Sequence, residues 1–114
     1  MAMTLQQARK FALSLPEATE EPHFEFTSFR IGGKIFATAP PESEYLHVFL
    51  PEDAREAALA RGADFLEELR WGKRVLGLRV MLPAAKPADV HALLEQAWAH
   101  KAPKRLRALR EPKD

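Results

Sequence analysis

Apolar residues at helical spacing predict a helix near the start of the chain. They recur every three or four residues along one face, at Leu5, Ala8, Ala12 and Leu15. Thr4 and Gln7 form a capping-box pattern, in which each side chain accepts a hydrogen bond from the backbone N–H of the other residue. We expect the helix to begin after Thr4 and to end at Pro16, because proline cannot continue a helix.

Aromatic and β-branched residues, which favour strands, follow in the next segment. They are Phe24, Phe26, Phe29, Ile31, Ile35 and Phe36. Gly32-Gly33 suits a two-residue hairpin turn, because glycine tolerates positive φ at both positions. This turn would place Ile31 opposite Lys34 and Phe29 opposite Phe36. Phe24 and Phe26 are then out of phase with Phe29 and Ile31, which predicts either a bulge near Thr27-Ser28 or a strand that begins only there.

The remaining pattern predicts further strands and two more helices. Residues 17–25 read as an acidic connector, and residues 45–50 as a third strand. Pro51-Glu52-Asp53 opens a helix that Gly62 ends, because proline and acids suit the first turn and glycine the C-terminal cap. Residues 65–71 fit a helix or a strand, and residues 76–82 alternate as a strand does. A last amphipathic helix carries Val90, Leu93, Leu94, Ala97 and Trp98.

The predicted order is therefore α-β-β-β-α-β-β-α, and Pro103 breaks or kinks the last helix. Strands joined by hairpins and flanked by helices are typical of an α+β domain with an antiparallel sheet. We expect one domain over residues 1–114, with a basic segment at 101–114.

Composition excludes several classes of protein. The chain has 114 residues, a net charge of +1 and no cysteine, which excludes disulfides, thiol nucleophiles and cysteine-ligated metals. The hydrophobic fraction of 46% is too high for a disordered chain. The first residues lack the pattern of a signal peptide, and the apolar runs are too short to span a membrane. We expect a soluble cytoplasmic protein that makes no membrane contact.

Catalytic motifs are missing from the sequence. There is no GxGxxG or phosphate loop, no serine in a nucleophile elbow and no HExxH pattern. We expect a protein without enzymatic activity and without a cofactor. The acidic connector could hold iron or manganese through His23 and nearby carboxylates. Its irregular spacing favours a solvated loop instead, so no metal site is predicted.

Cations at the two hairpins could contact phosphate groups. The first hairpin would place Arg30 and Lys34 at its tip, and the second would place Lys73 and Arg74 there. Two basic tips on one sheet could bind a nucleic-acid backbone; ordinary charged turns are an equally good interpretation. Trp71 beside the second tip could stack on a base or belong to the core.

The C-terminal segment concentrates positive charge. Residues 101–114 hold six cations against two acids, a net charge of +4, whereas residues 1–100 hold eleven cations against fourteen acids, a net charge of −3. Such segments bind nucleic acid or acidic partners, although cations also stabilise the end of a helix. The candidate phosphate-binding residues here are Lys101, Lys104, Arg105, Arg107 and Arg110.

Several stretches together resemble the MmcQ/YjbR family of small bacterial proteins. They are Leu15-Pro16-Glu17, Pro22-His23-Phe24, the run from Ser28 to Thr38, Trp71-Gly72, and the run from Ala97 to Leu106. The resemblance covers nearly the whole chain, and the run around Gly33-Lys34-Ile35-Phe36-Ala37 carries it most specifically. Many family members have an aromatic residue in the last strand, where this chain has Leu76-Gly77-Leu78.

The resemblance implies an α-β(3)-α-β(2)-α fold, related in shape to frataxin-like and secretion-chaperone-like domains. It places a strand near residues 68–71, hairpinned to the last strand. The family is labelled a predicted DNA-binding protein with a double-wing motif, and it has no established catalytic residues. We therefore expect a DNA-binding protein that contacts the phosphate backbone. The alternative is a protein-interaction or chaperone-like module that uses the sheet face, as a monomer or a weak dimer.

Overall fold

The predicted capping box forms at the start of the first helix, α1 (Leu5–Ser14). In this computed structural model, which describes residues 3–40 and 44–108, the backbone N–H of Gln7 donates to Thr4 Oγ1 (3.2 Å) and that of Thr4 donates to Gln7 Oε1 (3.0 Å). Ala8 and Ala12 are buried on the face that was expected to be apolar.

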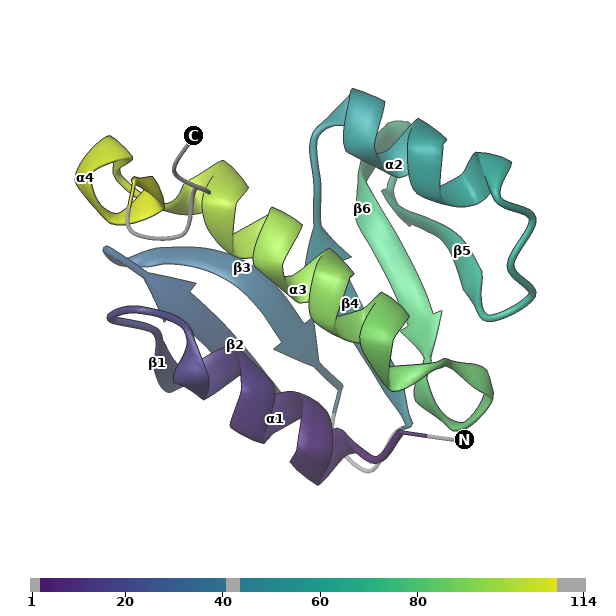
Figure 1. Ribbon diagram of the computed structural model, residues 1–114. Helices are drawn as coiled ribbons and strands as arrows, with labels where there is room; N and C mark the ends of the chain where they lie inside the picture. Colours follow the sequence, from purple (N-terminus) through teal and green to yellow (C-terminus); the bar gives the residue numbers. More distant parts are fainter. Residues whose placement is uncertain (1–2, 41–43, 109–114) are drawn as a thin grey trace.

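The described residues form one antiparallel sheet of six strands in the order β1-β2-β3-β4-β6-β5 (Figure 1). The strands are β1 (Thr19–His23), β2 (Phe26–Ile31), β3 (Lys34–Ala39), β4 (Tyr45–Phe49), β5 (Leu66–Trp71) and β6 (Arg74–Met81). The α+β class is confirmed. The predicted connector at residues 17–25 is wrong, because residues 19–23 pair along β2 as an edge strand. The element order therefore has one strand more than predicted.

The first hairpin turns at Gly32-Gly33, as predicted, and both glycines have positive φ (59° and 80°). Ile31 lies opposite Lys34, but Phe29 lies opposite Ala37 and not opposite Phe36. A register shift between Phe29 and Arg30 makes Phe36 the extra residue on β3. The bulge thus exists, but it lies nearer the turn than Thr27-Ser28, and it allows Phe36 to be fully buried.

The helices pack on one face of the sheet (Figure 1). They are α1, α2 (Glu52–Ala60), α3 (Pro87–Lys101) and the short α4 (Lys104–Arg107), with a 3₁₀ turn, η1 (Leu82–Ala84), before α3. All five residues that predicted the apolar face of α3 are buried. Trp98 also donates from Nε1 to the carbonyl of Pro16 (3.1 Å), which joins α3 to the end of α1.

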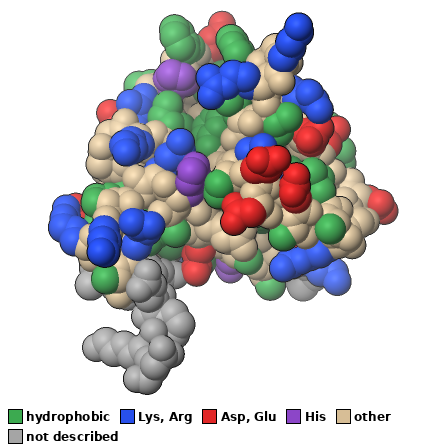
Figure 2. Space-filling model, turned by 90° about the horizontal axis from the view of Figure 1, so that it is seen from above, with side chains coloured by type: hydrophobic (Ala, Val, Ile, Leu, Met, Phe, Trp, Pro, Cys, Tyr) green, Lys and Arg blue, Asp and Glu red, His purple; other side chains and the backbone are tan. Residues whose placement is uncertain are grey.

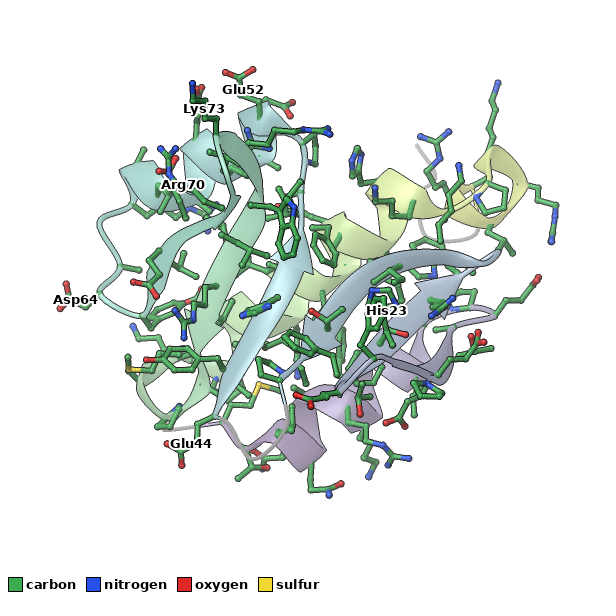
Figure 3. The ribbon with its side chains drawn as sticks, turned by 180° about the vertical axis from the view of Figure 1, so that it is seen from behind. His23, Glu44, Glu52, Asp64, Arg70 and Lys73 are labelled. Atoms are coloured by element: carbon green, nitrogen blue, oxygen red, sulfur yellow. The ribbon has the colours of Figure 1, made fainter. Side chains whose placement is uncertain are left out.

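The opposite face of the sheet carries no helix among the described residues, and Figure 3 shows it from behind. On β4, Leu46 and Val48 belong to the core. Because successive side chains alternate between the faces of a strand, His47 points to this open face. None of the described helices combines the length and apolar composition that a membrane crossing requires.

Candidate nucleic-acid interface

The first hairpin tip packs against the junction between α3 and α4. Pro103 Cδ lies 4.0 Å from the position that a Cβ atom on Gly32 would occupy. Proline ends α3 at Lys101, and α4 starts directly after Pro103. This packing brings cations from the hairpin and from the C-terminal segment to one place, which we call the basic surface: Lys34, Lys101, Lys104 and Arg107.

His100 lies close enough to two cations of the basic surface for their charges to act on it. Burial lowers the pKa of His100, and the charges of Lys101 and Lys34 lower it further, whereas Asp53 acts in the opposite direction. An open groove of about 600 Å³ between α2 and α3 is lined by both His100 and Arg107. In the described part of the chain, no salt bridge neutralises the four cations of the basic surface.

Arg30 does not lie at the hairpin tip, and that prediction is corrected. Its guanidinium turns back along the open face, where Nε donates to Ser28 Oγ (3.0 Å) and Nη2 to the carbonyl of Pro22 (3.4 Å). The carboxylate of Glu21 lies 4.0 Å away, and only 22% of the Arg30 side chain is exposed. These hydrogen bonds join Arg30 to β1 and direct its guanidinium away from the hairpin tip.

Arg105 is exposed but already paired. Its Nη1 and Nη2 donate to the two carboxylate oxygens of Glu17 (3.0 and 3.3 Å). Lys104 and Arg107 remain exposed on α4. The candidate Arg110 lies outside the described residues.

The second hairpin tip lies at the same end of the sheet as the first, where β3 begins and β4 ends. Trp71 pairs with Arg74 around the turn, and Lys73 and Arg74 are exposed. Trp71 is 77% exposed, so the interpretation that placed it in the core is wrong. The two hairpin tips therefore lie at one end of the same sheet, although Arg30 does not belong to the first tip.

Acidic residues lie at the same end of the sheet as the two tips. Strand β4 lies between the two hairpins in the sheet and ends at this end. It leads into α2, whose first turn holds Glu52 and Asp53. Figure 2 looks down on this end, where Lys and Arg side chains gather at the left and top, and Asp and Glu side chains gather at the right of centre. Glu52 and Lys73 appear at the same end of the sheet in Figure 3. Acidic side chains thus share this end of the sheet with the two basic tips.

The acidic residues near β1 are used in pairing. Glu17 binds Arg105, and Glu20 accepts a hydrogen bond from Arg9 Nε at 2.6 Å. Within residues 3–40 and 44–108, no three His, Cys, Asp or Glu side chains converge in a way that could hold a metal ion. The alternative that placed iron or manganese in this segment therefore has no geometric support there.

Sequence reasoning missed a row of polar residues across the open face. Strand register aligns one residue from each strand, in the order Glu21, Ser28, Thr38, His47, Arg79 and Glu67. Arg79 lies over the Tyr45 ring (3.9 Å to its centre) and contacts Glu67 (3.2 Å). Burial, and then the charge of Arg79, lower the pKa of His47. The six residues are far apart in sequence, so only a correct strand order could have found them.

Comparison with known proteins adds one relationship. No curated protein and no solved structure matches the chain. The model of the YjbR family matches residues 13–100, from within α1 to the penultimate residue of α3. Because this match spans more than half of the chain, the protein belongs to the YjbR family.

Proposed function

We propose that this protein binds the phosphate backbone of DNA through the basic surface, and that its role is binding without catalysis. One observation carries the proposal: the contact between the Gly32 turn and Pro103 gathers Lys34, Lys101, Lys104 and Arg107 from two distant parts of the chain. Each of these cations lacks a salt bridge among the described residues. Unpaired cations in a cluster release condensed counterions when they meet phosphates, which favours binding.

The proposal rests on the geometry of this chain. Of the four cations, only Lys34 lies within the residues that the family model matches. The remaining three come from the end of α3 and from α4. We identify no group in the basic surface that would read base edges, so the expected binding is independent of DNA sequence.

The second tip is expected to contribute less. Glu52 and Asp53 lie at the same end of the sheet, in the first turn of α2, and carboxylates repel phosphates. A duplex that contacted both tips would also meet the repulsion of these acids. We therefore assign the main contacts to the α4 side of this end.

The test is binding of a DNA duplex across a series of salt concentrations. Four phosphate contacts predict a slope of about −3.6 in log Kobs against log salt, at about −0.9 per contact. The double variant Lys104→Gln/Arg107→Gln should reduce the magnitude of that slope by about 2. Arg61→Gln/Lys86→Gln removes the same charge from exposed positions at the end of α2 and before α3, and should leave the slope nearly unchanged.

Two results would contradict the proposal. One is the absence of binding at low salt. The other is an equal loss of affinity in both double variants, since that would reflect total charge and not the basic surface. A variant of the second tip, Lys73→Gln/Arg74→Gln, ranks the two tips and should lose less affinity than Lys104→Gln/Arg107→Gln.

The sheet face is less well suited to a protein-interaction role. Three large hydrophobic side chains are exposed among the described residues: Phe24, Trp71 and Met81. Phe24 and Met81 lie at one end of the sheet and Trp71 lies at the other end, as the strand register shows. The polar row crosses the face between them, so these side chains do not form one apolar patch.

A further inference from the structure

Strand β5 is an edge strand whose outer backbone groups are open for pairing. The N–H of Met81 donates to the carbonyl of Phe65 (2.8 Å), so the backbone N–H and C=O groups of Phe65 point toward β6. Backbone groups alternate in direction along a strand. The N–H and C=O groups of Glu67 and Leu69 therefore also point toward β6, whereas those of Glu68 and Arg70 point outward, away from the sheet. Leu66 points outward too, but its N–H already approaches the carbonyl of Ala63 (3.4 Å).

We propose that a second copy of this chain pairs with β5, strand to strand, in an antiparallel two-fold dimer. The two-fold axis passes between Leu69 and the partner's Leu69. Glu68 then lies opposite the partner's Arg70, and Arg70 lies opposite the partner's Glu68. The outward N–H and C=O groups of these two residues form the hydrogen bonds between the strands.

The sequence of β5 selects this register among those that the symmetry permits. A two-fold axis perpendicular to the sheet places some residue opposite its own copy. If that residue were Glu68, two carboxylates would face each other and the N–H of Leu66 would be needed. If it were Arg70, two guanidinium groups would face each other. Only the register centred on Leu69 pairs opposite charges and uses free backbone groups.

Side chains on both faces of β5 fit the same register. On one face, Glu68 and Arg70 already form an ion pair within the chain (2.8 Å), so a dimer would hold four charges of alternating sign. On the other face, Trp71 comes diagonally beside the partner's Leu69, a distance that aromatic side chains span in antiparallel sheets. The pairing thereby covers Trp71, which is 77% exposed in the single chain.

The opposite edge of the sheet provides a contrast. Strand β1 contains Pro22, which has no N–H, and adjacent Glu20 and Glu21 with no Lys or Arg on the strand. Proline and like charges are features by which proteins prevent strands from pairing at a sheet edge. Strand β5 has no proline and carries charges of both signs. The dimer therefore forms through β5 and not through β1.

Charge exchange at positions 68 and 70 tests the proposal, with molar mass measured by analytical ultracentrifugation. The wild-type chain should dimerise with Kd below about 1 mM. Glu68→Arg and Arg70→Glu should each be monomeric, because each places like charges opposite each other. An equimolar mixture of the two variants should form a heterodimer, and the double variant Glu68→Arg/Arg70→Glu should dimerise as the wild type does.

Controls separate this interface from general effects of charge or folding. Glu25→Arg makes the same charge change at an exposed turn beside β1 and should leave the dimer intact. Amide hydrogen exchange gives a second measurement: the N–H groups of Glu68 and Arg70 should gain protection as the wild-type concentration rises. Circular dichroism detects a loss of folding in a single variant. In that case the molar mass of the double variant, which keeps the intrachain ion pair, tests the proposal.

A wild-type chain that stays monomeric at about 1 mM overturns the proposal. So does a dimer that survives both single substitutions, or a mixture of the two variants that does not associate. None of these outcomes depends on nucleic-acid binding, because Glu68, Leu69, Arg70 and Trp71 lie outside the basic surface.

Discussion

The guanidinium of Arg105 forms two hydrogen bonds with the carboxylate of Glu17, 88 residues earlier in the chain. The bonds lower the pKa of Glu17 and raise that of Arg105. They also tie α4 to the segment that follows α1. One cation of the C-terminal segment is thus neutralised beside the basic surface, although more than half of its side chain is exposed.

Removing the carboxylate of Glu17 should strengthen DNA binding. Glu17→Gln leaves Arg105 without its anionic partner, so the guanidinium becomes available to a phosphate. We expect tighter binding and a salt slope steeper by about 1, measured as for the wild type. Glu25→Gln makes the same change of net charge at the β1–β2 turn and should change the slope little. Equal effects of the two substitutions would mean that net charge alone sets the affinity.

The two tryptophans should differ sharply in their contribution to stability. Trp98 is buried and its Nε1 donates to Pro16, so Trp98→Phe leaves a small cavity and an unpaired carbonyl. We expect a loss of about 1–3 kcal/mol in the free energy of unfolding, measured with urea. Trp71→Phe should change this free energy by less than about 0.5 kcal/mol in dilute protein, because Trp71 is exposed. Similar losses in both variants would contradict the assigned burial.

His47 should make stability depend on pH in the acidic range. Burial and Arg79 lower its pKa in the folded state, while the unfolded chain binds a proton near pH 6.5. The stability that neutral His47 provides is therefore fully present above about pH 6.5 and decreases as the pH falls through the folded-state pKa.

Urea unfolding at several pH values checks this expectation. His47→Gln should weaken the dependence of the unfolding free energy on pH below about 6.5. The pKa of His100 is lowered as well, so part of the dependence should remain in His47→Gln and weaken further when His100→Gln is added. An unchanged pH profile in His47→Gln would show that this side chain titrates as it does in the unfolded chain.

Gly77 should be intolerant of any side chain. A Cβ atom there would lie 1.9 Å from the carbonyl oxygen of Val48 and 2.9 Å from the Cα of Phe49. Both are backbone atoms of β4, so relief requires the strands to separate. We expect Gly77→Ala to cost at least about 3 kcal/mol of unfolding free energy.

Gly33→Ala is the matched control for this substitution. Gly33 has positive φ but nothing within 4 Å of the added atom, so it should cost only about 1–2 kcal/mol. A smaller loss in Gly77→Ala than in Gly33→Ala would contradict the close approach of β4 and β6.

Local patterns were sufficient to predict the parts of the fold that local physics determines. The capping box at Thr4 and Gln7, the Gly32-Gly33 turn and the apolar face of α3 all depend on residues within a few positions of one another. Strand β1 was missed because its sequence, Thr-Glu-Glu-Pro-His, has few strand-favouring residues. It forms through pairing with β2, which only the folded chain supplies.

The candidate site was predicted in part for the same reason. The basic residues of the C-terminal segment formed a recognisable charge pattern, and the two tips were predicted to lie on one sheet. The packing of Gly32 against Pro103 and the presence of the α2 acids at the same end of the sheet are tertiary relationships. The direction of Arg30 was also invisible, because it depends on Ser28 and Pro22 accepting its hydrogen bonds.

The composition of β1 also limits how large any assembly can become. With Pro22 and two adjacent carboxylates at one border of the sheet and a pairable strand at the other, each molecule has a single side on which a sheet can be extended. When two molecules are joined at β5, the two β1 strands are the only unpaired edges of the combined sheet. In the proposed dimer, growth by strand addition would therefore stop at two molecules, and the β1 edges would oppose the formation of fibres.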